Sequence, residues 1–474
     1  MNADGQHCFR RNLGDLAKSF SLRCTSKFLR PEFDTFNQEL KHLKTVSLGS
    51  VCLRTIRRGV QPAYCEDGDV TVLKTAQLKH GHIDTSGALM VTTEFRDSHP
   101  SAIVRSGDVL ISSTGEGRGK IDVYLGSEPA VADSHVTIIT LGNGFSPIFV
   151  AELLRQPFGE MQLAQLEVAV KGTPEIYREE IAKIQLVPLA LDKQESIATR
   201  ILEIEDYITS AREGLRAADE IIDEILCAEF DYPLREHRER EKIQQFTTNL
   251  HTMASGFTLR SSSKFHHPGF ELTECFFARK AHERINAFVA VPIRLGATAT
   301  KSDLIEDGSA YYVHPGATKR QEVIDVADCH QITDEFYASA RQRFGLRRGD
   351  VILNRAAEGT IGKSGLWDSD EFAVASDFTM RIRFNDRINP RFAWYYFRSV
   401  MFQTQVVREK RGMGNMTNIF PSEVEHMLIV ACEKSKQDAL VRDIEHELEY
   451  RKSLLRSIES NRAEIATLVK QALR

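Results

Sequence analysis

The longest regular pattern of hydrophobic positions in the chain runs from about Lys193 to Glu229. Gly214 is the only glycine in this stretch, which contains no proline. The gaps between its apolar residues alternate between four and three, as in the seam of a coiled coil, and these residues are Ile197, Ile201, Ile204, Ile208, Ala211, Leu215, Ala218, Ile222 and Ile225. The pattern predicts a single helix, roughly 55 Å long, that buries a narrow apolar stripe against a partner helix.

The end of the chain provides a partner for this helix. A shift of 243 residues places Lys436-Gln437 on Lys193-Gln194 and Tyr450 on Tyr207. We expect the two stretches to pair with each other, although each alone would equally fit an amphipathic helix packed on its own core. A polar residue in a seam fixes register at some cost in stability, and the second copy has three of them, at Glu447, Arg451 and Asn461.

The duplication extends over most of the chain, which makes it the main feature of its organisation. The segment Leu22 to Phe33 returns as Leu259 to Phe270, with seven identities in twelve positions. Gly107 to Ile111 matches Gly349 to Leu353. In both copies this predicts a turn, a buried strand and then a glycine-rich hairpin.

Further short strands and helices are predicted at matching places. Val46 to Gly49 and Ile293 to Gly296 are expected to be equivalent strand starts. Val70 to Leu73 is expected to match Tyr311 to Val313, because both are rich in residues that favour strands. Proline in the first turn predicts a short helix in each copy, at Pro147 to Arg155 and Pro390 to Arg398.

The order of elements is therefore a globular domain, a long helix, a second globular domain and a second long helix. Between the copies, Asp231 to Glu241 is rich in charged residues. We expect this connector to be solvated and to carry no chemistry.

The composition is that of an ordinary soluble protein. Of 474 residues, 42% are apolar and 27% charged, and the formal net charge is −5. We expect no membrane span, because no run of about 18 apolar residues is present. The eight cysteines form no C-x-x-C pair, which argues against a zinc site or disulfide framework and for a reducing cytoplasm.

Three motifs suggest chemistry, and each has a simpler interpretation. Gly359 to Ser364 resembles a phosphate-binding loop, but Ala357 stands where the first glycine is required. Asp133-Ser134-His135 suggests a catalytic triad, but triads combine residues far apart in sequence, so a polar turn is expected. His266-His267 lacks a second ligand pair at metal spacing. We therefore expect no catalytic residue, no cofactor and no metal.

Basic residues gather in three groups: Arg54, Arg57 and Arg58; Arg341, Arg343, Arg347 and Arg348; and Arg408, Lys410 and Arg411. Solvated surface charge explains most such groups, but these adjoin Gly- and Asn-containing loops. Arg and Lys can pair with guanine, and Asn with adenine. The candidate DNA-binding residues are Lys120, Lys171, Lys363, Arg411 and Asn415.

Three features recur in the same order in both copies: Ser-Lys-Phe-x-x-Pro-x-Phe, a Gly-Asp-Val strand with a Glu-Gly/Gly-Lys hairpin, and the Lys-Gln opening of each long helix. In this two-copy order the chain resembles the specificity (S) subunit of type I restriction–modification systems, over about residues 20 to 474. The resemblance implies an α+β fold with two duplicated β-rich target recognition domains, separated by two long helices that pair as an antiparallel coiled coil.

The resemblance also implies a function. Each recognition domain would read one half of a split site in double-stranded DNA, and the helices, beginning at Gln194 and Gln437, would set the gap. Two copies of an adenine methyltransferase subunit would dock on the helices, and a restriction/translocase subunit can join. The expected parts are an N-terminal extension (1–19), recognition domain 1 (20–190), spacer helix 1 (191–230), a connector (231–256), recognition domain 2 (257–433) and spacer helix 2 (434–474).

Other functions remain compatible with the sequence. The chain could be the DNA-reading subunit of another phage-defence complex. From a different class, it could be a stand-alone DNA nuclease or a protein scaffold, although no convincing cluster of acidic residues followed by a lysine marks a nuclease centre.

Overall fold

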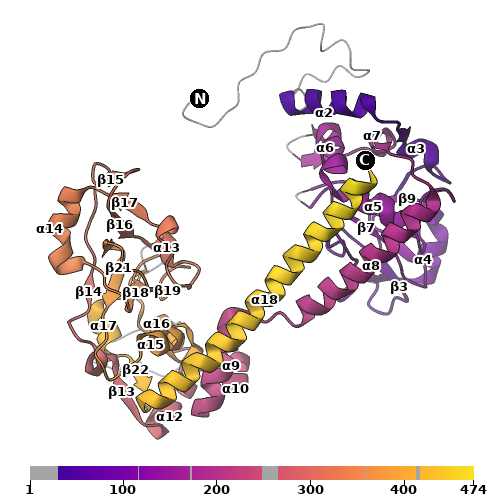
Figure 1. Ribbon diagram of the computed structural model, residues 1–474. Helices are drawn as coiled ribbons and strands as arrows, with labels where there is room; N and C mark the ends of the chain where they lie inside the picture. The colour runs from indigo at the N-terminus through magenta and orange to yellow at the C-terminus, as the bar shows by residue number, and fades with distance from the viewer. Residues whose placement is uncertain are drawn as a thin grey trace. The chain divides into compact units, whose positions relative to one another are not determined.

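The computed structural model describes residues 30–115, 117–170, 173–247, 265–357, 359–412 and 417–473. The chain divides into two compact units. Unit 1 comprises residues 1–214 and 455–474, and unit 2 comprises residues 215–454. The C-terminal helix α18 (Lys434–Ala472) contributes to both units (Figure 1).

Unit 1 is built around two four-stranded sheets. The main sheet has the order β2-β9-β6-β7 and the second sheet the order β4-β3-β8-β5. The central strands of the main sheet are buried along their whole length, as expected for strands covered on both faces. The strands are β2 (Arg57–Arg58), β3 (Val70–Leu73), β4 (Met90–Val91), β5 (Ile103–Val104), β6 (Val109–Ser112), β7 (Ile121–Val123), β8 (Ala130–Ala132) and β9 (Val136–Ile139).

Unit 2 repeats this plan. Its main sheet has the order β14-β21-β18-β19, and its second sheet the order β15-β17-β16-β20. Strand β3 pairs in parallel with β8 in unit 1, as β16 pairs with β20 in unit 2, so the predicted match of Val70–Leu73 with Tyr311–Val313 is confirmed. The strands are β14 (Arg294–Leu295), β15 (Leu304–Ile305), β16 (Ala310–Val313), β17 (His330–Ile332), β18 (Asp350–Asn354), β19 (Ser364–Trp367), β20 (Ala373–Ala375) and β21 (Thr379–Ile382).

One predicted pair of equivalent strands is wrong. Val46–Ser47 forms β1, which pairs with β12 (Gln185–Leu186), and its counterpart in unit 2 is β13 (His282–Arg284), which pairs with β22 (Leu428–Val430). Arg294–Leu295 belongs instead to the main sheet, like β2 in unit 1. The shared Leu-Gly pair misled the comparison, because a two-residue strand is defined by its partner strand.

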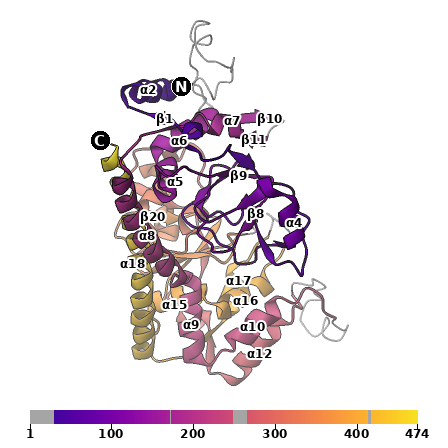
Figure 2. The same cartoon turned by 90° about the vertical axis from the view of Figure 1, so that its right-hand side faces the viewer.

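The helices that cover the main sheets begin and end as predicted, as α5 (Pro147–Arg155) and α15 (Pro390–Arg398). In unit 1, α5 packs against both β7 and α8, and Figure 2 shows α5 beside α8. The turn before each buried main-sheet strand has a glycine at φ +88°, Gly107 and Gly349, a conformation that favours glycine. The remaining helices of the globular parts are α2 (Pro31–His42), α3 (Leu48–Val51), α4 (Thr93–Ser98), α6 (Pro157–Leu166), α7 (Arg178–Ile181), α12 (Gly269–Arg279), α13 (Pro315–Thr318), α14 (Asp334–Phe344), α16 (Val400–Glu409) and α17 (Pro421–His426).

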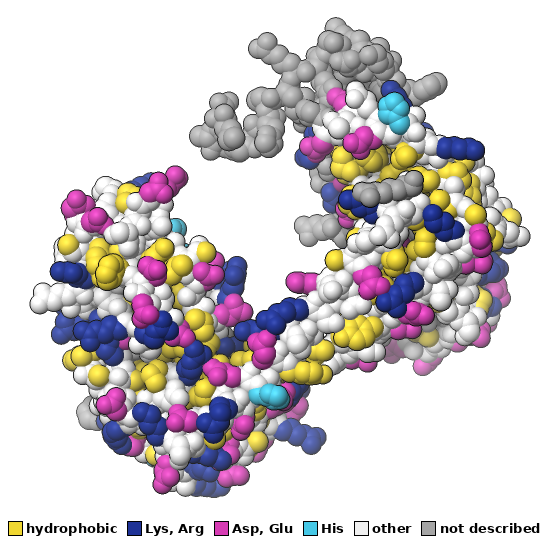
Figure 3. All heavy atoms as spheres, viewed as in Figure 1, with side chains coloured by type: hydrophobic (Ala, Val, Ile, Leu, Met, Phe, Trp, Pro, Cys, Tyr) yellow, Lys and Arg dark blue, Asp and Glu magenta, His cyan; other side chains and the backbone are white. Residues whose placement is uncertain are grey.

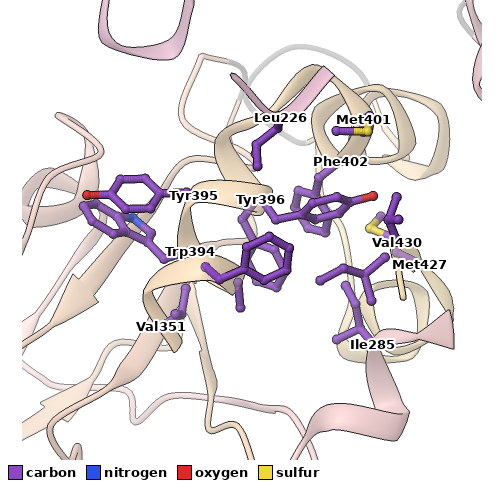
Figure 4. Close-up of a cluster of buried hydrophobic side chains, with 14 of the residues drawn as sticks. Leu226, Ile285, Val351, Trp394, Tyr395, Tyr396, Met401, Phe402, Met427 and Val430 are labelled. Carbon is purple, nitrogen blue, oxygen red and sulfur yellow. The ribbon is translucent and has the colours of Figure 1, made fainter. Parts of the chain in front are cut away.

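The main core of unit 2 is aromatic and includes the long helices. Tyr396 and Phe402 lie at its centre, with Met427 and Val430 beside them (Figure 4). Leu226, from the first long helical stretch, belongs to the same cluster, which also contains α18 residues. The second half of the first long stretch and the first half of α18 are therefore anchored in the hydrophobic core of unit 2.

The first long stretch is two helices and not one, which corrects the prediction of a continuous helix. Helix α8 (Leu191–Glu213) ends at Gly214, and α9 (Ala218–Phe230) begins after a short break. Glycine costs about 1 kcal/mol relative to alanine in a helix. The Arg216 carbonyl, inside the break, accepts a hydrogen bond from Arg451 Nε at 2.9 Å, and the Arg216 guanidinium pairs with Glu447 at 2.7 Å. These polar seam residues of α18 therefore stabilise the interruption.

The helices pair in antiparallel fashion with α18, as predicted. In unit 1, Arg200 pairs with Glu464 at 2.7 Å, and Tyr207 lies 2.9 Å from Ser457. In unit 2, Glu229 pairs with Lys436 at 2.7 Å, and Arg216 with Glu447. Within each unit, residue numbers rise along α8 or α9 as they fall along α18. The apolar seam closes between them, with Ile201, Ile204 and Ile208 in one cluster with Ile465 and Val469.

The connector is not the solvated segment that its charge suggested. Residues Leu234–Glu241 form α10, which packs against α9 and α12. His237 is 1% exposed, and its ring is hydrogen-bonded to the Tyr232 hydroxyl at 2.9 Å. One face of this charged helix is therefore part of the core of unit 2. Across the described residues, no helix is long and apolar enough to cross a membrane.

Candidate nucleic-acid interface

In unit 2, two loops meet at one end of the main sheet. The strand β18 leads into the first, which contains residues 355–357 and 359–363, and the described residues 411–412 and 417–418 belong to the second. Ala356 bridges Asn418, and the Ile419 N–H donates to the Arg355 carbonyl at 2.9 Å. Arg411 and Asn418 exchange backbone hydrogen bonds of 2.8 and 2.7 Å across the second loop. We call the described residues of 355–363, 376–378 and 411–420 the tip of unit 2.

Unit 1 has the same construction. After β6, residues 113–120 meet the hairpin of β10 (Val168–Val170) and β11 (Thr173–Glu175). Thr114 bridges Glu175, and the Ile176 N–H donates to the Ser113 carbonyl at 2.9 Å. We call the described residues of 113–120, 133–135 and 167–176 the tip of unit 1. Both tips place a hairpin beside a glycine-rich turn.

Of the five candidate residues, Lys120, Lys363 and Arg411 are described and lie at these tips. Lys120 and Lys363 are equivalent and half-buried, and their carbonyls accept the Ser112 and Asn354 N–H groups at 2.9 and 2.8 Å. The turn that carries Lys363 is joined to the loop that begins at Arg411. Lys171 and Asn415 lie outside the described residues.

Arg411 is exposed but held in place. Its side chain is 57% exposed, and Nε lies 2.9 Å from Glu423 Oε1. The other carboxylate oxygen of Glu423 accepts the Phe420 N–H at 2.8 Å, at the start of α17. The Arg411 guanidinium is thus oriented by a carboxylate that is itself fixed.

Each tip is fastened by a guanidinium that the sequence analysis did not assign to it. In unit 2, Arg355 donates to the Asp377 carbonyl at 2.8 Å and to Asn418 Oδ1 at 3.2 Å. In unit 1, Arg58 donates to the Ser134 carbonyl and to Glu175 Oε1. Each arginine therefore ties the turn after the second-sheet strand to the hairpin of its own tip.

The acceptors are equivalent in the two copies, but the arginines are not. A shift of 243 residues places Ser134 on Asp377 and Glu175 on Asn418. Arg58 lies on β2, whereas Arg355 follows β18. A comparison of aligned positions could not have found this pair. The basic group that contains Arg58 was the only sequence signal.

Arg58 and Arg355 leave different net charges at their tips. Arg58 pairs with a carboxylate, Glu175, whereas Arg355 bonds a neutral amide, Asn418. The fastening group therefore adds a net positive charge at the tip of unit 2 but not at that of unit 1. Over the face seen in Figure 3, Lys and Arg side chains alternate with carboxylates, so local charges of this kind decide where phosphate is attracted.

Two buried glutamines connect the long helices to the globular parts. Gln194 Oε1 accepts the Ser146 N–H at 3.0 Å, and Gln437 Oε1 accepts the Asn389 N–H at 2.7 Å. Their amide groups donate to the carbonyls of Leu189 and Cys432 at 2.8 and 3.0 Å. Ser146 and Asn389 cap α5 and α15, so each glutamine fixes a long helix to the helix that covers the main sheet.

The motifs set aside in the sequence have structural roles. Gly359–Ser364 leads into strand β19 and not into the helix that a phosphate-binding loop requires. The His135 ring is hydrogen-bonded to the Thr114 hydroxyl, as part of a turn. Among the residues that the structure describes, no group of three or more His, Cys, Asp or Glu side chains could hold a metal ion.

Among known proteins, only solved structures match this chain. No family model and no curated protein matches the sequence. The chain is similar to the S subunit of a type I restriction–modification system from M. genitalium, with 9% identity, a TM-score of 0.49, and coverage of 90% of this chain and 95% of that chain. It is also similar to a chain from a study of complex assembly and conformational transition of the type I system, with 13% identity, a TM-score of 0.48, and coverage of 91% and 97%.

A third neighbour is the HsdS subunit from Thermoanaerobacter tengcongensis, with 14% identity, a TM-score of 0.35, and coverage of 91% of this chain and 96% of that chain. The first and third of these neighbours are described as S or HsdS subunits, and the second comes from a type I restriction–modification system. Since all three TM-scores lie below 0.5, the functional proposal rests on the features of this chain itself.

Proposed function

We propose that this chain is a non-catalytic, sequence-specific DNA-binding subunit that recognises a bipartite site and directs an adenine methyltransferase to it. The observation that carries the proposal is the duplication of a whole assembly: a tip that sets a hairpin beside a glycine-rich turn, a sheet, and a helix fixed to that sheet by a buried glutamine. A ligand with two separate halves is the simplest reason to duplicate such an assembly in one chain.

Each globular part reads one half-site. Residues 20–190 form recognition domain 1 and residues 257–433 form recognition domain 2, with the paired helices between them as a spacer. Affinity comes from phosphate contacts by lysine and arginine, and specificity from contacts to base edges in the major groove. Lys120 and Lys171 serve the first half-site, and Lys363, Arg411 and Asn415 the second.

The chemistry is supplied by partners. Two equivalent helix pairings offer two equivalent docking surfaces, which suits two copies of a methyltransferase subunit. A restriction/translocase subunit can join the same complex. The chain itself needs no cofactor or metal for this role, because binding and positioning are all that it contributes.

The first experiment is genome-wide methylation mapping in the source cell, with and without this gene. We expect the loss of one split motif, two short blocks around a fixed gap, in cells without the gene. Unchanged methylation would refute the role in guiding a methyltransferase and favour a DNA reader of another defence complex. Metal-dependent DNA cleavage by the purified chain alone would favour a nuclease.

A further inference from the structure

The tip of unit 2 exposes two phenylalanines that both contact Arg355. Phe378 is 53% exposed and Phe420 is 42% exposed. The guanidinium of Arg355 lies 5.9 Å from the centre of the Phe420 ring, and the Arg355 backbone N–H donates to the Phe378 carbonyl at 3.1 Å. Aromatic rings and cations that share one surface are a combination that binds nucleic acids.

Phe378 is presented by a rigid turn. Ser376 and Thr379 are fully buried, and the Phe378 N–H donates to Ser376 Oγ at 3.1 Å. Asp377 is occupied elsewhere, because its carboxylate accepts hydrogen bonds from Thr298 at 3.0 Å and Tyr312 at 3.5 Å. The backbone thus holds the exposed Phe378 ring on a fixed support, with the neighbouring carboxylate directed toward hydroxyl groups of its own unit.

The equivalent position in unit 1 has different chemistry. His135 is also exposed and follows the same kind of turn, because Asp133 and Ser376 make equivalent parallel bridges with Val60 and Ala297. The Nδ1 atom of His135 is hydrogen-bonded to Thr114, which leaves Nε2 as its second polar group. One frame therefore presents a polar ring in unit 1 and an apolar ring in unit 2.

We propose that Phe378 reads the 5-methyl group of a thymine in the half-site bound by unit 2. This inference rests on the proposed function. The thymine methyl is the apolar group that the major groove presents, and contact with a phenyl ring removes both from water. The equivalent residues His135 and Phe378 would then both determine specificity. Phe378 would contact a methyl group in the half-site of unit 2, and His135 would contact a polar group in the half-site of unit 1.

The test uses the full chain and DNA in which single methyl groups are removed. The preferred site is first selected from random duplexes. Each thymine is then replaced, one at a time, by deoxyuridine, which keeps the same hydrogen-bonding edges. One replacement should weaken binding of the wild-type chain about fourfold, the effect of one buried methyl group. The same replacement should have no effect on Phe378→Ala.

Matched variants separate this contact from a general effect. Phe372 is 60% exposed and lies at the opposite end of β20 from Phe378, so Phe372→Ala should keep the full response to deoxyuridine. Because Phe378 is exposed, Phe378→Ala should fold normally, as circular dichroism would show. His135→Phe should introduce a new thymine preference in the other half-site.

Several outcomes would overturn the inference. The first is a selected site that contains no thymine in the half-site affected by Phe378→Ala. The second is wild-type binding that is equally strong to every deoxyuridine duplex. The third is a loss of affinity in Phe378→Ala that is equal on the thymine and the deoxyuridine duplex. Increased 2-aminopurine fluorescence on wild-type binding that Phe378→Ala abolishes would identify a wedge between base pairs instead. A selection that yields no preferred sequence would refute the proposed function itself and is recognised before any thymine is replaced.

Discussion

Arg391 of α15 donates a hydrogen bond of 2.8 Å to Glu445 of α18 and so joins the globular part of unit 2 to the long helix. The same guanidinium contacts Asp368, after β19. In unit 1 the three equivalent positions are all apolar, Ile148, Leu202 and Leu125, and they line a pocket of about 380 Å³. At these three positions the two copies thus make the same junction with an ionic cluster in one and with apolar side chains in the other.

This difference predicts that the junction of unit 2 depends on salt. Arg391→Ala should destabilise unit 2 by about 0.5–1 kcal/mol, because it removes the cation that two partly exposed carboxylates share. The loss should shrink in 1 M NaCl, where such interactions are screened. Urea unfolding at low and high salt measures both effects.

The control places the apolar residues of unit 1 at the three equivalent positions of unit 2. Asp368→Leu, Arg391→Ile and Glu445→Leu together should recover most of the stability and remove its dependence on salt. If Arg391→Ala were as stable as the wild type at low salt, the ionic cluster would have no role in joining the helix to the globular part.

Substitution of a buried glutamine should lower stability more than substitution of Arg391. Gln437→Leu should destabilise unit 2 by about 2–3 kcal/mol, because it leaves the Asn389 N–H and the Cys432 carbonyl without a side-chain partner in a buried site. Thermal unfolding and hydrogen exchange at the start of α18 measure the loss. Gln471→Leu, on the exposed face of the same helix, should change stability by no more than about 0.5 kcal/mol. Equal effects of the two substitutions would contradict the anchoring role.

The sequence predicted those features that depend on local chemistry. The bounds of α5 and α15 follow from proline in the first turn after Ser146 or Asn389. The turns at Gly107 and Gly349 follow from a conformation that favours glycine. Gln194 and Gln437 were recognised only as helix starts, since the N–H groups that they bind, those of Ser146 and Asn389, lie 48 residues away in sequence.

Other features were missed because they depend on tertiary contacts. The break between α8 and α9 does not interrupt the apolar spacing, and its stabilising partners, Glu447 and Arg451, lie on another helix. Arg355 was missed because its counterpart in unit 1, Arg58, comes from a different strand. Duplicated sequences therefore predicted shared backbone better than shared side-chain roles.

Arg355 itself provides a third prediction. Arg355→Ala should weaken binding of the half-site read by unit 2 by about tenfold, because the hairpin loses its link to the turn at Asp377. Arg355→Lys should not restore binding, since a lysine cannot donate to two acceptors with the fixed geometry of a guanidinium. Fluorescence anisotropy with duplexes altered in one half-site at a time gives the measurement. Full rescue by lysine would mean that only the charge matters.

Substitution of Arg411 tests whether this residue contacts a DNA base directly. Arg411→Ala should cost about 1–3 kcal/mol of binding and relax the preference at one base pair of the half-site. A uniform loss across all sequences would instead identify a phosphate contact, and no change would remove Arg411 from the interface. Binding to a panel of single-base variants distinguishes these results. Lys436→Ala, on α18 and paired with Glu229, is a control that removes a cation outside the tip.

The paired helices should act as a ruler between the half-sites. Seven residues inserted into α18 alone shift one helix against its partners by two turns, which would displace ion pairs such as Arg200–Glu464 in unit 1 or Arg216–Glu447 in unit 2. We expect this variant to lose assembly. Seven residues inserted into both α8 and the part of α18 that pairs with it keep the seam in phase and lengthen the pair by about 10 Å. At 3.4 Å per base pair, the preferred gap should grow by about three base pairs. Selection of binding sites from random DNA measures the gap, and an unchanged gap at full affinity would show that the helices do not set it.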